Sequence, residues 1–135
     1  MPLPIVGMHF RPPAKALVAT LRPGTPLVAR REPDNEFDPN AIRVLVTSEV
    51  IMAQPDPSGE FSAAIESALS EFGFSLRDIA AQAEWHLGYI PATIAASLAP
   101  RLELDKDYEG KFTLSPSSKP MIDIEFPQAE SSDDS

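Results

Sequence analysis

Cysteine is absent from this chain of 135 residues. Without thiols, the protein can have neither a disulfide scaffold nor a thiolate metal site. No apolar run approaches the roughly 20 residues of a membrane span. The first ten residues, "MPLPIVGMHF", also lack the basic region and long apolar core of a secretion signal. We therefore expect a soluble, cytoplasmic protein with no membrane partner.

Known enzyme motifs are also missing. The two histidines, His9 and His86, are far apart in the sequence, and neither a Gly-x-Ser-x-Gly elbow nor a glycine-rich phosphate loop is present. The acidic residues Asp123 and Glu125 fall on one face of a predicted strand, an arrangement that could bind a metal but is more often a solvated face. We expect a protein that is not an enzyme, with no cofactor and no metal site.

Charge is unevenly distributed along the chain. The net charge is −9, which argues against nonspecific binding to phosphate backbones. Residues 1–48 nevertheless carry a net charge of +2, whereas residues 49–84 carry −6. The acidic character is therefore mostly outside the first third of the chain.

Apolar periodicity and turn residues predict short strands and short helices within a single domain over 1–128, followed by a disordered acidic tail over 129–135. The helical pair near 59–84 separates two strand-like runs, so we expect 49–84 to be an insertion between strands. These elements favour a small β-barrel or an α+β domain. The predicted strands are 5–10, 25–32, 41–52, 85–91, 108–114 and 121–126, and the predicted helical segments lie within 12–24, 61–72, 75–83 and 92–103.

Several single residues carry specific expectations. Gly73 stands where a helix end favours a left-handed residue, and "SLRD" at 75–78 is a weaker form of the capping box. Gly88, inside a strand, predicts a bulge or a close backbone approach. Pro100 is expected to end or kink its helix, and Trp85 is expected in the core.

The most informative stretch is "REPDNEFDPNAIRV", residues 31–44. Asp, Asn and Pro alone could make it an ordinary turn. Phe37 is different, because a ring in a polar loop must either tuck into the core or offer a surface for stacking. Beside it, Asp38 could accept a hydrogen bond from a sugar hydroxyl while a base stacks on the ring.

This stretch, together with "IVGMHF" at 5–10 and "LGYIPATIAASLAPRLE" at 87–103, resembles the HIRAN domain. The similarity covers about 5–48 and 85–104. It implies a mainly β fold with short helices, an OB-like six-stranded β-barrel carrying an inserted helical pair. In DNA-repair translocases that remodel replication forks, such a domain holds the free 3′ end of single-stranded DNA.

The resemblance also implies site residues. Asp38 would take the terminal 3′-hydroxyl, and Phe37 and Phe10 would sandwich the last base. Asn35 matches the loop Asn of the family, Asn40 would brace the loop, and Tyr89 would lie near a phosphate. The full set implied for nucleic-acid binding is His9, Phe10, Arg11, Asn35, Phe37, Asp38, Asn40 and Tyr89.

Alternatives remain for these residues and for the whole protein. Phe10 could belong to the core, Phe37 could plug the loop, and Asp38 could only cap the turn. The first strand has His9 where DNA-binding members have arginine, and no lysine follows Pro91. The second functional hypothesis is a protein-interaction adaptor, with partner binding or self-association through the acidic helices of 53–84.

Overall fold

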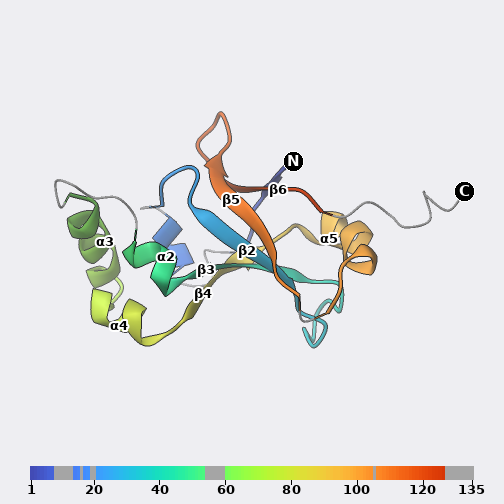
Figure 1. The fold of residues 1–135 in the computed structure, drawn as a ribbon, viewed down its shortest axis with the longest axis horizontal. Helices are drawn as coiled ribbons and strands as arrows, with labels where there is room; N and C mark the ends of the chain where they lie inside the picture. The colour runs from blue at the N-terminus through green and yellow to red at the C-terminus, as the bar shows by residue number, and fades with distance from the viewer. Residues whose placement is uncertain (8–13, 16, 19–20, 54–59, 105, 127–135) are drawn as a thin grey trace, which may run out of the picture.

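The protein is a curled, mainly antiparallel β structure (Figure 1). The computed structural model describes residues 1–7, 14–15, 17–18, 21–53, 60–104 and 106–126. Within these ranges six strands form one sheet, ordered β1-β6-β5-β2-β3-β4. The strands are β1 (Pro2–Pro4), β2 (Pro26–Arg31), β3 (Ile42–Thr47), β4 (Glu84–Tyr89), β5 (Tyr108–Leu114) and β6 (Pro120–Ile124). The sheet curls into a half-barrel, which confirms the OB-like, mainly β fold.

A bridge between described residues joins the two edges of this sheet. Val6, just after β1, pairs with Tyr89 of β4, and each N–H donates to the other's carbonyl at 2.8 Å. Gly88 permits this approach, because a Cβ there would lie 2.5 Å from the Val6 carbonyl oxygen. The β3–β4 register also shifts between Val44 and Leu45, opposite Gly88 and His86. Both parts of the expectation for Gly88, a bulge and a close approach, are therefore confirmed.

The first strand differs from its prediction. A strand was expected over 5–10, but β1 spans Pro2–Pro4 and pairs with β6. Two prolines are tolerated here because β1 is an edge strand, where a missing N–H breaks no second ladder. Residues 8–10 lie outside the described part of the chain.

The long strand predicted over 41–52 is also partly wrong. β3 ends at Thr47, and Ser48–Met52 forms the helix α2. The Thr47 hydroxyl accepts a hydrogen bond from the Val50 N–H at 3.2 Å, which caps the helix. The β-branched run continued the strand pattern past this point, but local capping by a threonine outweighed that preference.

Helices α3 (Glu60–Ser70) and α4 (Leu76–Ala81) complete the segment between β3 and β4. The capping box of Ser75 and Asp78 is present, and Gly73 has a φ of +82°, so both predictions are confirmed. The segment contributes to the core through Ile51, Ile65, Leu69 and Ile79, all buried. Trp85 is buried as predicted, and its indole N–H donates to the Ile79 carbonyl at 3.1 Å. The segment between β3 and β4 thus shares one hydrophobic core with the strands.

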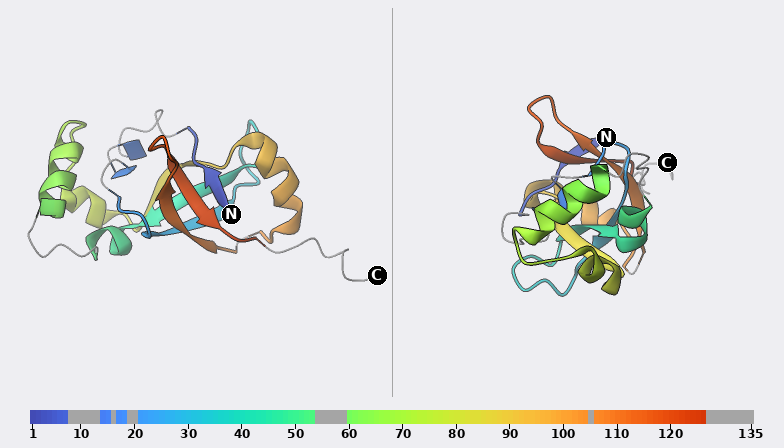
Figure 2. Two further views of the ribbon diagram at one scale, coloured as in Figure 1. Left: turned by 90° about the horizontal axis from the view of Figure 1, so that it is seen from above. Right: turned by 90° about the vertical axis from the view of Figure 1, so that its left-hand side faces the viewer.

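After β4 the chain forms α5 (Ala92–Leu98) and then the 3₁₀ turn η2 (Ala99–Arg101), so Pro100 marks the end of the α-helix as predicted. α5 and the loop 32–41 lie at one end of the molecule, whereas α3 and α4 lie at the opposite end (Figures 1 and 2). The described helices include none with the length and apolarity that a bilayer crossing requires.

Candidate nucleic-acid interface

A groove with a volume of about 460 Å³ opens at the end of the sheet, between the loop 32–41 and the start of α5. The Val6–Tyr89 bridge places β4 and the chain after β1 against this loop, so the groove draws on three distant parts of the sequence. The residues that line it are Val6, Asn35, Glu36, Phe37, Asp38, Ala41, Tyr89, Ile90 and Ala92. Four of the residues predicted from the sequence line it, namely Asn35, Phe37, Asp38 and Tyr89, and Asn40 lies in the adjoining turn.

Phe37 is the most exposed large apolar side chain among the described residues, with 90% of its surface accessible. It therefore does not plug the loop or enter the core. An exposed ring gains nothing from burial in the free protein, so its value to the fold is small. Its face is open to stacking by a planar ligand.

Asn35 shapes the loop that carries this ring. Its side-chain oxygen Oδ1 accepts hydrogen bonds from the backbone N–H groups of Phe37 at 2.8 Å and Asp38 at 2.9 Å. Its backbone N–H donates to the Glu32 carbonyl at 3.1 Å. These bonds hold the tip of the loop in one conformation, as Asn side chains do in turns.

Asp38 has one carboxylate oxygen engaged in the turn. Oδ1 accepts the Asn40 backbone N–H at 2.9 Å, and the Asp38 carbonyl accepts the Ala41 N–H at 3.0 Å. Oδ2 accepts no hydrogen bond from the residues that the structure describes. Asp38 thus caps the turn and still offers an acceptor, and Asn40 contributes its backbone to the brace.

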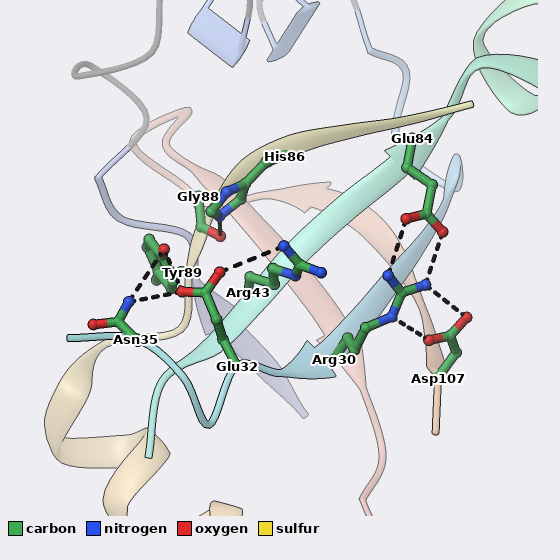
Figure 3. A network of polar contacts seen from close by, with 9 residues as sticks. All are labelled: Arg30, Glu32, Asn35, Arg43, Glu84, His86, Gly88, Tyr89 and Asp107. Atoms are coloured by element: carbon green, nitrogen blue, oxygen red, sulfur yellow. Dashed lines mark hydrogen bonds and ion pairs between the residues drawn. The ribbon is translucent and has the colours of Figure 1, made fainter. Parts of the chain in front are cut away.

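Glu32 lies behind this loop at the centre of a polar network (Figure 3). Its Oε1 accepts from the Asn35 side-chain amide and from the Tyr89 hydroxyl, both at 2.7 Å, and its Oε2 pairs with Arg43 at 3.4 Å. Burial raises the pKa of Glu32, but the bonds from Asn35 and Tyr89 and the charges of Arg43 and His86 outweigh it, so the pKa falls below its ordinary value. The carboxylate is therefore charged at neutral pH.

A second network holds the other end of the same sheet face. Arg30, directly opposite Arg43 on the next strand, donates to both oxygens of Glu84 at 2.9 and 2.7 Å. It also donates to Asp107 at 2.6 and 3.0 Å (Figure 3). Hydrogen bonds from Arg30 lower the pKa of both carboxyls, and the same bonds raise the pKa of Arg30. This cation is thus paired with two protein carboxylates.

The charge of the groove is negative over its described lining, which contains the carboxylates of Glu36 and Asp38 but no lysine or arginine. The three predicted residues of the first strand, His9, Phe10 and Arg11, lie outside the described residues. Tyr89 lines the groove, and its hydroxyl donates to Glu32.

Sequence reasoning did not select Glu32 or Val6. Glu32 is part of the "REP" motif, so the motif itself was the signal that could have found it. Val6 enters the site only because the sheet curls until β4 meets the chain after β1, a contact that no local pattern encodes. Neither residue type indicates a binding role by itself.

Metal binding has no support among the described residues, because no group of three or more His, Asp or Glu side chains comes together there. Asp123 and Glu125 instead face the N-terminus. The Met1 ammonium donates to Asp123 at 2.9 Å and also pairs with Glu125. The ammonium thus pairs with both carboxylates at this end of the sheet.

A half-barrel with a lined groove at its rim is an architecture that many small nucleic-acid-binding domains share. The HIRAN domain family model matches residues 2–125, nearly the whole chain. The chain therefore belongs to the HIRAN domain family. HIRAN domains are themselves non-catalytic binding modules, and the family supports nucleic-acid binding in general. At a significant level of similarity, no curated protein and no solved structure matches this chain.

Proposed function

We propose that this protein captures the 3′-hydroxyl end of single-stranded DNA in the rim groove. The observation that carries the proposal is the juxtaposition of Phe37, 90% exposed, with Asp38, whose Oδ2 accepts no bond from the described residues. Both line the same groove. The HIRAN membership supports nucleic acid as the ligand class.

In this proposal the last base stacks on the Phe37 ring, a contact that contributes about 1–3 kcal/mol. The terminal hydroxyl donates to Asp38 Oδ2, which accepts a charge-assisted hydrogen bond. The exposed residues Val6 and Ala92 of the groove lining border the sugar and base. Recognition depends on shape and on the chain end, so sequence preference is weak.

The negative lining supports preference for a hydroxyl end over a phosphate end. A 3′-phosphate would bring added negative charge close to Glu36 and Asp38, which repel it. A hydroxyl brings no charge and supplies a donor to a carboxylate. The groove is therefore suited to an unmodified terminus.

The test compares labelled single strands that differ only at the 3′ end, hydroxyl against phosphate, with a blunt duplex as a third probe. The hydroxyl strand should bind, and the phosphate strand should bind at least about tenfold more weakly, since a charge-assisted hydrogen bond contributes about 1.5–3 kcal/mol. Equal affinity for the two ends would refute end capture. No binding of any strand at 50 mM salt would refute the proposed function as a whole.

Asp38→Asn is the informative variant, because asparagine keeps an oxygen for the Asn40 N–H while its amide nitrogen cannot accept the hydroxyl. We expect a loss of about 10- to 100-fold for the hydroxyl end. Asp34→Asn is the matched control, since Asp34 is exposed in the same loop and does not line the groove. It removes the same charge and should change affinity little.

A protein-interaction role is the second candidate, supported by exposed Met52 and Phe72 on the otherwise acidic helical segment. Deleting 53–84 is a poor test, because Ile65, Leu69 and Ile79 belong to the core. Phe72→Ser keeps the core intact. Loss of self-association or of partner binding on light scattering and pull-down would favour this role, and no change would count against it.

A further inference from the structure

The loop that presents Phe37 and Asp38 has few apolar anchors of its own. Its flanking residues Glu32 and Ala41 are joined by a backbone hydrogen bond of 2.9 Å, but the tip between them is exposed or half-buried. What fixes the tip is Asn35, whose Oδ1 accepts both the Phe37 and the Asp38 N–H. The position of the binding groups therefore depends on the orientation of one side-chain amide.

That orientation is set by Glu32, together with a longer contact of 3.4 Å from the Asn35 amide nitrogen to the Tyr89 hydroxyl. The Asn35 amide nitrogen donates to Glu32 Oε1 at 2.7 Å, so the amide oxygen must face the loop N–H groups. The same Oε1 accepts the Tyr89 hydroxyl at 2.7 Å, which ties the loop to β4. One carboxylate oxygen thus links the two sides of the groove (Figure 3).

We propose that Glu32 is the positioning residue of this site, and that it acts through Asn35 to hold Phe37 and Asp38 in the geometry that binds the strand end. The role of the positioned groups in binding depends on the proposed function, whereas the positioning itself can be measured without a ligand. Glu32 is not among the residues that line the groove.

The contact geometry predicts which substitutions matter. Glu32→Gln can keep an oxygen at the Oε1 position, so both 2.7 Å bonds persist and only the Arg43 ion pair is lost. Asn35→Asp keeps an acceptor for the loop N–H groups but sets a carboxylate oxygen against Glu32 Oε1. Two like charges at this distance repel, so the tip is pushed away from β4.

The combined variant Glu32→Gln with Asn35→Asp reverses donor and acceptor. The introduced glutamine amide donates to the introduced carboxylate, so the link is restored with opposite polarity. A merely destabilising effect at each site would accumulate in the double variant, whereas a positioning link predicts rescue. Rescue is therefore the decisive outcome.

The first readout is solvent exchange of the Phe37 and Asp38 backbone amides, measured by NMR at neutral pH without ligand. Asn35→Asp should raise both exchange rates by about tenfold, the scale of one lost charge-assisted hydrogen bond. Glu32→Gln should change these exchange rates little. In the double variant both rates should return most of the way to those of the unsubstituted protein. The Val44 and Val46 amides of β3 should not change, which separates loop release from unfolding.

The second readout is affinity for the 3′-hydroxyl strand, which should fall about tenfold in Asn35→Asp and recover in the double variant. Unchanged exchange in Asn35→Asp, or no rescue, would overturn the positioning role. Rescue of exchange without rescue of affinity would overturn its link to binding. If the unsubstituted protein binds no strand, the proposed function fails, while the exchange pattern still decides whether Glu32 positions the loop.

Discussion

Val6 and Tyr89 exchange both of their backbone hydrogen bonds, each at 2.8 Å, and so join the two edges of an otherwise open sheet. Both side chains then line the rim groove. The site is thus a product of closure, because the loop 32–41 would face open solvent if the chain after β1 moved away from β4.

Gly88→Ala should open this closure. The new Cβ would lie 2.5 Å from the Val6 carbonyl oxygen and 2.9 Å from the Ile5 side chain, so the bridge must shift. We expect a loss of about 1–3 kcal/mol in the free energy of unfolding, measured by urea denaturation. The Val6 and Tyr89 amides should exchange faster. Gly73→Ala serves as control, since it meets no atom within 4 Å and its strain at φ +82° should leave those two amides protected.

Phe37→Ala should separate stability from binding. Because 90% of the ring is exposed, the unfolding free energy should change by no more than about 0.5 kcal/mol. Affinity for single-stranded DNA should fall by about 1–3 kcal/mol, the contribution of one stacked base. Fluorescence anisotropy of a labelled strand measures the second effect. Unchanged affinity would show that the ring is not a stacking platform.

Binding should depend weakly on salt. With about three phosphate contacts, log affinity should fall with a slope of roughly −2 against log salt concentration, or about tenfold to twentyfold between 50 and 200 mM. Ala92→Lys offers a matched variant, because Ala92 is exposed on the groove lining. A lysine there should raise affinity and steepen the slope by about 0.7. A slope near −6 for the unsubstituted protein would indicate an extended phosphate-binding surface elsewhere.

Acid should destabilise the protein through three carboxyls. The pKa values of Glu32, Glu84 and Asp107 lie below their ordinary values of 4.5, 4.5 and 3.8 in the folded state. Their stabilising contribution is therefore complete above about pH 5 and is lost as pH falls through the lowered folded-state values. Thermal unfolding monitored by circular dichroism from pH 7 to pH 2.5 should show the melting temperature fall mainly below pH 4.5.

Arg30→Met tests how much of this fall of the melting temperature with pH comes from Glu84 and Asp107. Without the guanidinium, Glu84 and Asp107 lose the hydrogen bonds that lower their pKa values, so the acid dependence should become shallower. Their side chains are 41% and 47% exposed, so each pair should contribute less than about 1 kcal/mol at neutral pH. An unchanged dependence of the melting temperature on pH would show that other carboxyls cause the acid sensitivity.

Much of the fold could be predicted because its signals are local. The capping box at Ser75, the left-handed Gly73 and the end of α5 near Pro100 each depend on a few neighbouring residues, and all three are present. The run after Thr47 differs from its strand prediction because a β-branched sequence fits both a strand and the entry to a capped helix. Only the hydrogen bond from Val50 to Thr47 decides between them.

The candidate site was only partly predictable, for a different reason. Phe37 and Asp38 are adjacent in the chain, so their juxtaposition could be anticipated from the motif. The tie between Glu32 and Tyr89 spans 57 positions and exists only after β3 and β4 pair. A side chain that acts by holding others in place cannot be recognised from its residue type. Its role can be identified only once the pairing of the strands is known.

The placement of α3 at the end of the molecule away from the loop 32–41 has a practical consequence (Figure 2). Ser67 is exposed on that helix, and the chain contains no cysteine. Ser67→Cys would therefore create a unique thiol for attaching a fluorophore or a sensor surface. Molecules immobilised in this way would all share one orientation, with the groove directed into the bulk liquid.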